Sequence, residues 1–329
     1  MSTETEDGLL DRYRKRNQGL MRSVGRGWNR FTNHKLGVVG VVIMLGLIGM
    51  AVFAPYLAPH TLEWTAPDTV GADSECKSLS CLSEQQGEKG HISHPEGPRF
   101  GNPYFAPLGT DDQGHDILSQ LIWGSRTALY IGFAAGILSS LVGVPLGLIS
   151  GFYGDSWIDE AIQRIVDIMY GLPFLPLVIV LVALRGITTT NVIIAIAVKS
   201  WLNNAIVIRG ETLSLKERPF IEAAKVAGGT DTRIVFRHIM PNVLPLAFVY
   251  LAQDAAFAVL TQAALAFLGF ADFTKISWGT MLQWIQVTGN VYSAPWWLIP
   301  PGIMITLLAA SFYFIGYSLE DVMNPHTES

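Results

Sequence analysis

The sequence predicts an all-α integral membrane protein with six transmembrane helices, on the basis of its composition and its long uncharged segments. Half of the 329 residues are hydrophobic and only 15% are charged, and the mean hydropathy is +0.35. These values exclude an ordinary soluble domain. A helix needs about 20 mostly apolar residues to cross the hydrocarbon core. Such segments, each with at most one charged residue, occur at 36–53, 127–154, 168–184, 186–208, 244–271 and 297–319.

Prolines and tryptophans refine the limits of these segments. Pro55 and Pro59 follow the first segment, as suits the end of a helix. Because this segment begins after 35 residues and lacks a convincing cleavage site, we expect a retained anchor rather than a secretory signal. Pro173 and Pro176 interrupt the third segment and indicate either a static kink or a gating kink. Four tryptophans indicate an interfacial segment before the last span, namely Trp278, Trp284, Trp296 and Trp297.

The distribution of Lys and Arg predicts that both termini are cytoplasmic. Residues 1–35 carry eight basic and four acidic residues, whereas 54–125 carries three basic and ten acidic ones, and basic loops favour the cytoplasmic side of the cell membrane. Residues 209–238, with six basic against four acidic residues, fall on the same side. Only 155–167 dissents, with one basic residue against four acidic ones, and acidic residues weigh little in this rule.

These assignments divide the chain into segments with different surroundings. The predicted segments are a cytoplasmic arm (1–35), a first transmembrane helix (36–58), an extracytoplasmic loop (59–125), a five-helix core (126–319) with a cytoplasmic loop at 209–242, and a cytoplasmic tail (320–329). The extracytoplasmic loop contains both cysteines, Cys76 and Cys81, and an oxidising exterior favours a disulfide between them. A metal site that adds His91 and His94 is an alternative, although the spacing is not a standard zinc pattern. Two unpaired thiols are the third alternative.

The cytoplasmic loop at 209–242 reads as two helices with a break between them. Pro219 is acceptable in the first turn of a helix, the six residues from Glu222 favour a helix, and Gly228 with Gly229 ends it. Thr230 or Asp231 can cap a second helix that runs to His238, with Pro241 and Pro245 at the entry to the fifth span. On composition alone, the first helix would lie on the lipid headgroups.

The same loop resembles the EAA loop of ABC importer permeases. The resemblance is carried by Glu222-Ala-Ala, Gly228 and Pro241, and residues 237–242 are similar to the version in dipeptide and oligopeptide permeases. In that family the loop docks into a groove on the ATPase subunit. The resemblance therefore implies a coupling helix whose ATPase-coupling residues are Glu222, Ala223, Ala224, Gly228, Asp231, Arg237 and Pro241.

The resemblance covers most of the chain outside residues 1–30 and about 60–106. Family-like segments occur at 108–116, Ser119, 124–129, 265–270, 277–282 and 293–296. Together they point to the C-type permease of the dipeptide, oligopeptide and nickel group, which implies the type I ABC importer permease fold and a path for peptides, or for nickel or another small solute. The chain departs from the family pattern at His115 and Gln120 (usually Arg), Gln262 (often Glu), Ala266 (Ser) and Met240 (commonly Leu), which leaves the solute open.

The sequence contains no phosphate loop of the form Gly-x4-Gly-Lys-Ser/Thr, so the chain cannot bind and hydrolyse ATP by that route. We therefore expect a transport subunit and not an enzyme, with no cofactor in this chain. The resemblance implies that ATP and Mg²⁺ are bound by partners. These partners would be two ATP-binding cassette ATPases, working with a second homologous permease and an extracytoplasmic substrate-binding protein. ATP-driven closure of the ATPases would reorient the spans through the coupling helix.

Charged side chains within a span usually mark a pathway or a paired interior site. Lys199 and Asp254 are such residues, and Asn203 lies one turn from Lys199, so these three are candidates for the translocation path. Alternatively, the two opposite charges neutralise each other, and Asn203 and Asn204 hydrogen-bond a neighbouring helix. A secondary transporter or channel is the rival class of protein, but the sequence shows no convincing internal repeat.

Overall fold

The chain folds as a bundle of long membrane-spanning helices. The computed structural model describes residues 32, 34–62, 95–101 and 104–323, so Cys76, Cys81 and their predicted disulfide lie outside the described residues. Five described segments are long and apolar enough to cross a membrane, and a bent pair of helices makes a sixth if it counts as one span. The predicted all-α membrane architecture is confirmed in this form.

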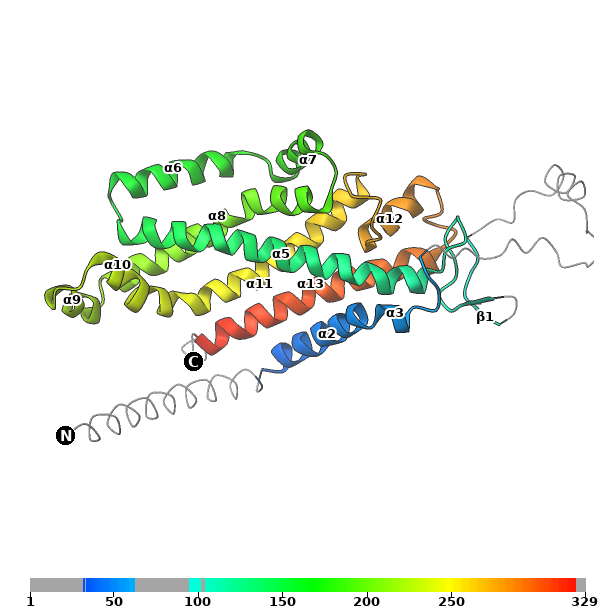
Figure 1. Ribbon diagram of the computed structural model, residues 1–329, viewed down its shortest axis with the longest axis horizontal. Coiled ribbons are helices and arrows are strands. Elements are labelled where there is room, and N and C mark those ends of the chain that lie inside the picture. The colour runs from blue at the N-terminus through cyan, green and yellow to red at the C-terminus, as the bar shows by residue number, and fades with distance from the viewer. Residues whose placement is uncertain (1–31, 33, 63–94, 102–103, 324–329) are drawn as a thin grey trace, which may run out of the picture.

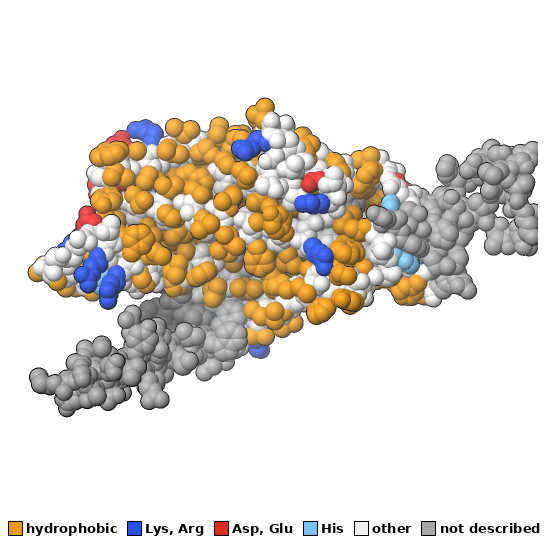
Figure 2. All heavy atoms as spheres, in the orientation of Figure 1, with side chains coloured by type: hydrophobic (Ala, Val, Ile, Leu, Met, Phe, Trp, Pro, Cys, Tyr) orange, Lys and Arg blue, Asp and Glu red, His pale blue; other side chains and the backbone are white. Residues whose placement is uncertain are grey.

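The five long helices run side by side along the longest axis of the molecule (Figure 1). They are α2 (Lys35–Val52), α5 (Ile117–Phe152), α8 (Thr189–Lys216), α11 (Met240–Phe267) and α13 (Pro295–Met323). The short helices α9 (Pro219–Val226) and α10 (Asp231–Ile234) lie at one end, and α3 (Ala54–Leu57) lies toward the other. Hydrophobic side chains cover the middle of the face seen in Figure 2, and Lys and Arg gather at the α9 end.

The close packing of α8 against α5 depends on glycines where the two backbones meet. A Cβ atom at Gly143 would lie 2.4 Å from the carbonyl oxygen of Trp201 and 2.5 Å from the Cβ of Asn204. Gly147 and Gly151 make similarly close approaches one and two turns further along α5. Because small residues at this spacing let membrane helices approach each other, α8 follows α5 from mid-membrane to its inner end.

The third span is broken. It consists of α6 (Trp157–Gly171) and α7 (Phe174–Arg185), which meet at an angle of 93° at Leu172 and Pro173. The prolines therefore mark a break rather than a kink in a continuous span. The segment 155–167, predicted as a loop, is also mostly helical, because the Ser156 hydroxyl accepts a hydrogen bond from the Asp159 N–H and caps α6.

The end of the bundle opposite α9 is closed by short elements (Figure 1). Strand β1 (Arg99–Gly101) pairs antiparallel with β2 (Tyr104–Ala106), and α12 (Trp278–Val287) packs against α5, α11 and α13. The Trp278 indole N–H donates to the Leu121 carbonyl oxygen at 2.9 Å. A short helix before the last span was expected from the tryptophans and is present as α12, whereas Trp278 and Trp297 are both buried.

Candidate functional site

The helix predicted to couple to an ATPase is the separate short helix α9, which projects from the end of the bundle (Figure 1). Pro219 occupies its first turn, where no N–H is required. Ile221 is completely buried in an apolar cluster with residues of α5, α8 and α11, among them Leu148, Ile208 and Val243. The anchor of α9 is therefore a side chain in an apolar cluster that three spans share.

The end of α9 is a glycine-dependent turn. The Gly228 N–H donates to the Lys225 carbonyl at 2.9 Å, and the Gly229 N–H donates to the Ala224 carbonyl at 3.0 Å, which together form a Schellman motif. Gly228 has φ = +78°, a left-handed conformation that glycine adopts without a steric penalty. The predicted helix stop at Gly228 and Gly229 is thus confirmed, and this turn reverses the chain toward α10.

The second half of the loop differs from the prediction. No break follows His238, because the π-helical turn η1 (Val235–Ile239) joins α10 directly to α11. The Met240 N–H donates to the carbonyl of Val235, five residues back, and this wider turn leads into α11 with Pro241 in its first turn. The prediction that the helix ends at His238 is therefore wrong.

Most of the predicted coupling residues are exposed on this projecting loop. Glu222, Ala223, Gly228, Asp231, Arg237 and Pro241 are exposed, and Ala224 is half-buried. Three exposed apolar side chains that were not predicted lie on the same loop. These are Phe220, Val226, which is 90% exposed, and Phe236. Their signal was available, because large apolar residues in a polar cytoplasmic loop indicate a surface that a partner covers.

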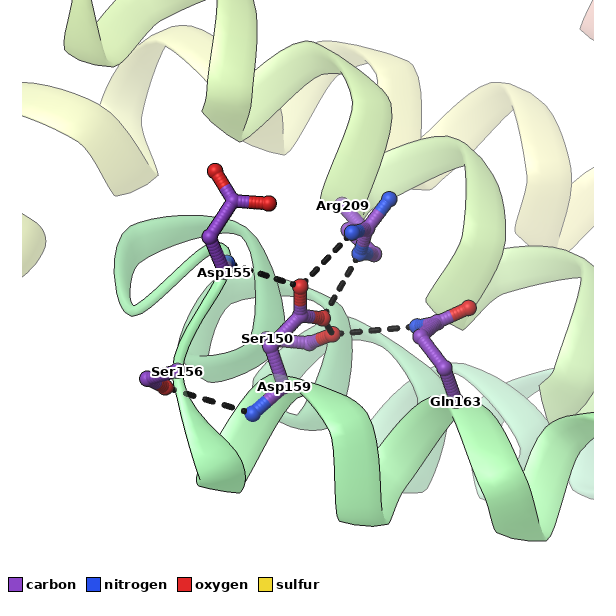
Figure 3. A network of polar contacts seen from close by, with 6 residues as sticks. All are labelled: Ser150, Asp155, Ser156, Asp159, Gln163 and Arg209. Atoms are coloured by element: carbon purple, nitrogen blue, oxygen red, sulfur yellow. Dashed lines mark hydrogen bonds and ion pairs between the residues drawn. The ribbon is translucent and has the colours of Figure 1, made fainter.

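A polar network lies near the coupling loop, where α5, α6 and α8 meet (Figure 3). Arg209 of α8 donates from Nε and Nη2 to the two carboxylate oxygens of Asp159, both at 2.7 Å. The Ser150 hydroxyl of α5 donates to Asp159 at 2.5 Å, and Gln163 donates to the Ser150 oxygen at 3.0 Å. Side chains of three helices thus join on one buried carboxylate. Sequence reasoning did not find this network, because nothing in the spacing pairs Asp159 with Arg209.

Lys199 and Asp254, two of the predicted path residues, do not form the ion pair that was one of the predicted alternatives. Lys199 donates to the carbonyl oxygen of Leu172 at the break of the third span. Asp254 of α11 is only 5% exposed and accepts a hydrogen bond from the Asn204 amide at 2.7 Å. The Lys199–Asp254 ion pair is therefore wrong, and Asn204 makes the interhelical hydrogen bond that was the other alternative. Asn203 is exposed and accepts from the Tyr170 hydroxyl.

Asp111 organises the outer turn that leads into α5. Its carboxylate accepts hydrogen bonds from the backbone N–H groups of Gln113 and His115, from the His115 ring at 3.1 Å and from the Gln120 amide at 2.6 Å. The hydrogen bond to Asp111 raises the pKa of His115, as does the nearby charge of Asp112, against an opposing effect of burial. The two departures His115 and Gln120 therefore share one function, that of donors to the same carboxylate.

No group of three or more His, Cys, Asp or Glu residues is arranged to hold a metal ion in the part of the chain that the structure describes. The alternative metal site with His91 and His94 lies outside that part and stays a prediction. Donors within the spans, such as the Lys199 ammonium and the Asn204 amide, instead form hydrogen bonds within the chain.

Comparison with known proteins shows which protein family the chain matches. Residues 143–329 match the family described as "Binding-protein-dependent transport system inner membrane component", and residues 24–71 match the "N-terminal TM domain of oligopeptide transport permease C". The dipeptide transport system permease protein DppC of Alkalihalophilus pseudofirmus is 34% identical over 92% of this chain and 90% of its own. The oligopeptide transport system permease protein OppC of Bacillus subtilis is 31% identical over 90% and 87%.

Other relatives and a solved structure extend this comparison. The glutathione transport system permease protein GsiD of Pectobacterium atrosepticum is 30% identical over 92% of this chain and 91% of its own. An inward-facing structure of the MetNI methionine ABC transporter superposes with a TM-score of 0.51 at 18% identity, covering 64% of this chain and 97% of that one. At this identity the likeness shows the fold alone, which is that of an importer permease.

Proposed function

The chain belongs to the inner-membrane permease components of binding-protein-dependent ABC importers, and from this premise we propose that it forms the translocation path for di- or oligopeptides together with a second, homologous permease. Peptides are favoured over nickel or another small solute because the relatives compared above are named for dipeptide, oligopeptide and glutathione transport. The substrate would arrive from an extracytoplasmic binding protein, and both termini would be cytoplasmic.

We also propose that α9 couples the chain to an ATPase, because one side of this helix is exposed and the other is buried in the bundle. Its exposed side bears Glu222 and Val226, whereas Ile221 is completely buried between the inner ends of α5, α8 and α11. A partner that grips the exposed side would therefore move the buried anchor and, through it, three spans. ATP binding and hydrolysis, with Mg²⁺, would occur in two partner ATPase subunits.

Purification of the tagged chain in mild detergent tests the assembly. We expect it to copurify with two ATPase subunits and a second permease, and the reconstituted complex to take up peptides only when ATP and the binding protein are supplied. Recovery of the chain alone, without an ATPase, would contradict the proposal. Uptake that is driven by an ion gradient in the absence of ATP would instead favour the secondary-transporter class.

A further inference from the structure

We propose that the surface formed by the break of the third span and the adjacent side of α8 is the wall of the aqueous path in the inner half of the membrane. This inference rests on the proposed function and adds to it the residues that face the solute. The surface, called here the break surface, is defined by Asp167, Tyr170, Leu172, Lys199 and Asn203.

The break lies near the middle of the membrane. Lys199, which contacts the break through the carbonyl of Leu172, is ten residues from the outer start of α8 at Thr189 and ten residues from Arg209. At 1.5 Å per residue, each distance is about 15 Å, or half of a hydrocarbon core of about 30 Å. The segment that interrupts the helix is therefore at a depth where lipid would otherwise surround it.

Contact with lipid is unfavourable for this break. Gly171, Leu172 and Pro173 are all exposed in the chain, and backbone that is not helical occurs at membrane depth only where protein buries it or where it lines a water-filled cavity. The Leu172 carbonyl accepts a hydrogen bond from Lys199, and the Pro173 carbonyl accepts one from the Leu177 N–H. The exposed break therefore faces a water-filled path or a protein partner.

The exposed polar side chains at the break favour water over lipid. Asp167 is an exposed charged residue one turn before Gly171. Asn203 is exposed on α8 and accepts a hydrogen bond from the hydroxyl of Tyr170, which is also exposed. Charged and amide groups within spans face a bundle interior or a water-filled cavity, because lipid exposure is unfavourable. In contrast, the exposed residues of α2 in the run 36–53 are apolar, as lipid contact requires.

The attachment of α6 suits a path wall that moves. Only two of its fifteen residues, Asp159 and Val166, are buried, so little apolar area holds it in place. Polar contacts fix both ends instead, with the Asp159–Arg209 ion pair at the inner end and the bonds of Tyr170 and Leu172 at the break. The exposed hydrogen bonds at the break, unlike the buried ion pair, can be exchanged for bonds to water or solute at little net change in free energy.

The chemistry of the break surface fits a peptide backbone. It presents an ammonium donor at Lys199, an amide that both donates and accepts at Asn203, a carboxylate at Asp167, and the uncovered backbone of a helix end. These groups match the N–H, carbonyl and charged terminal groups of a peptide without selecting one side chain. Asp254 lies behind this wall, because it is buried and bonded to Asn204.

Cysteine labelling in the assembled complex tests the wall. The background carries Cys76→Ser and Cys81→Ser, and the test variants are Asp167→Cys and Asn203→Cys. The control is Val42→Cys on α2, which is 63% exposed on an apolar side. A membrane-impermeant maleimide is applied to inside-out vesicles, and a hydrophobic maleimide applied in parallel checks that every thiol is present. We expect the impermeant reagent to label both test variants but not the control, and excess transported peptide to reduce this labelling.

The outcomes separate this inference from the proposed function, because peptide uptake is measured in vesicles of the Cys76→Ser, Cys81→Ser background, which keeps Asp167 and Asn203. If the background takes up peptide but D167C and N203C resist the impermeant reagent, the break surface is covered by protein or lipid, and the inference is overturned while the importer remains. If both variants are labelled but the background takes up no peptide, the peptide assignment fails, and the placement of the water-filled path is supported.

Discussion

Arg209 of α8 and Asp159 of α6 form a bidentate ion pair, and the Asp159 carboxylate is nearly inaccessible to solvent. Both N···O distances are 2.7 Å, and the side chains of Arg209 and Asp159 are 27% and 5% exposed. The buried carboxylate is stable because Arg209, Ser150 and the Asp155 N–H all donate to it. Since α6 has so few buried side chains, this pair is the main attachment of its inner end.

Removing the charge of Asp159 should therefore release α6. We expect Asp159→Asn to lower the free energy of unfolding by about 3 kcal/mol, because it leaves a partly buried guanidinium without its counter-charge, and to reduce uptake strongly. The matched control is Glu160→Gln, which breaks the exposed Glu160–Arg164 pair on the same helix and should change stability by less than about 1 kcal/mol. Denaturant unfolding in detergent measures both, and equal losses would contradict this account.

The packing of α5 against α8 gives a second prediction. We expect Gly143→Ala to destabilise the protein by about 1–3 kcal/mol, because the added methyl group would meet the Trp201 backbone at 2.4 Å. Gly46→Ala in α2 is the control, since nothing lies within 4 Å of a Cβ at that position. Thermal unfolding in detergent compares the two variants. Equal stability would show that α8 moves away from α5 without penalty.

Much of the fold could be predicted because bilayer constraints act directly on the sequence. The uncharged segments placed five spans approximately, whereas the third span begins at Trp157, within a predicted loop. The glycine pair at 228 and 229 ended α9 where it was expected. Helix lengths were less predictable. α5 begins at Ile117 and α8 continues to Lys216, both well beyond their uncharged segments, because charged residues at a helix end can remain in a helix outside the hydrocarbon core.

What could not be predicted depends on contacts between distant residues. Asp159 meets Arg209 and Asn204 meets Asp254 across 50 positions in each case, and no local pattern specifies such pairs. The continuity through Pro241 also escaped prediction, because a π-helical turn removes the conflict that a proline causes in an ordinary helix. The break at Pro173 was signalled by its prolines, but its angle of 93° and the hydrogen bond from Lys199 to the Leu172 carbonyl were not.

The turn at the end of α9 predicts how coupling can be abolished without loss of the fold. Gly228→Pro should eliminate ATP-driven uptake, because proline requires φ near −65° and Gly228 has φ = +78°. Gly228→Asn is the control, since Asn tolerates the left-handed region, and it should retain most of the uptake. Both variants should insert normally, because the turn lies outside the spans. Normal uptake in the proline variant would exclude α9 as the coupling element.

Reversing the exposed charge of Glu222 on the same helix gives a complementary test. Glu222 is exposed in the first turn of α9, where a carboxylate interacts favourably with the helix dipole. We expect Glu222→Arg to abolish uptake and ATPase copurification while leaving membrane insertion intact, because the reversed charge would face the proposed ATPase partner. Glu217→Arg, just before α9, is the matched control. A similar loss in both variants would indicate a general effect of charge.

The outer turn around Asp111 should respond to pH through His115. The hydrogen bond to Asp111 raises the pKa of His115 above its ordinary value of 6.5, so the folded protein binds this proton more tightly than the unfolded chain. The resulting stabilisation is fully present below about pH 6.5 and is lost as the pH rises through the folded-state pKa. His115→Gln removes the titrating group but keeps a donor near Asp111. We therefore expect the stability of the wild-type protein relative to His115→Gln to fall between about pH 6 and pH 8, as measured by thermal unfolding in detergent. A difference that stays constant or grows over this range would show that His115 is not charged against Asp111 in the folded protein.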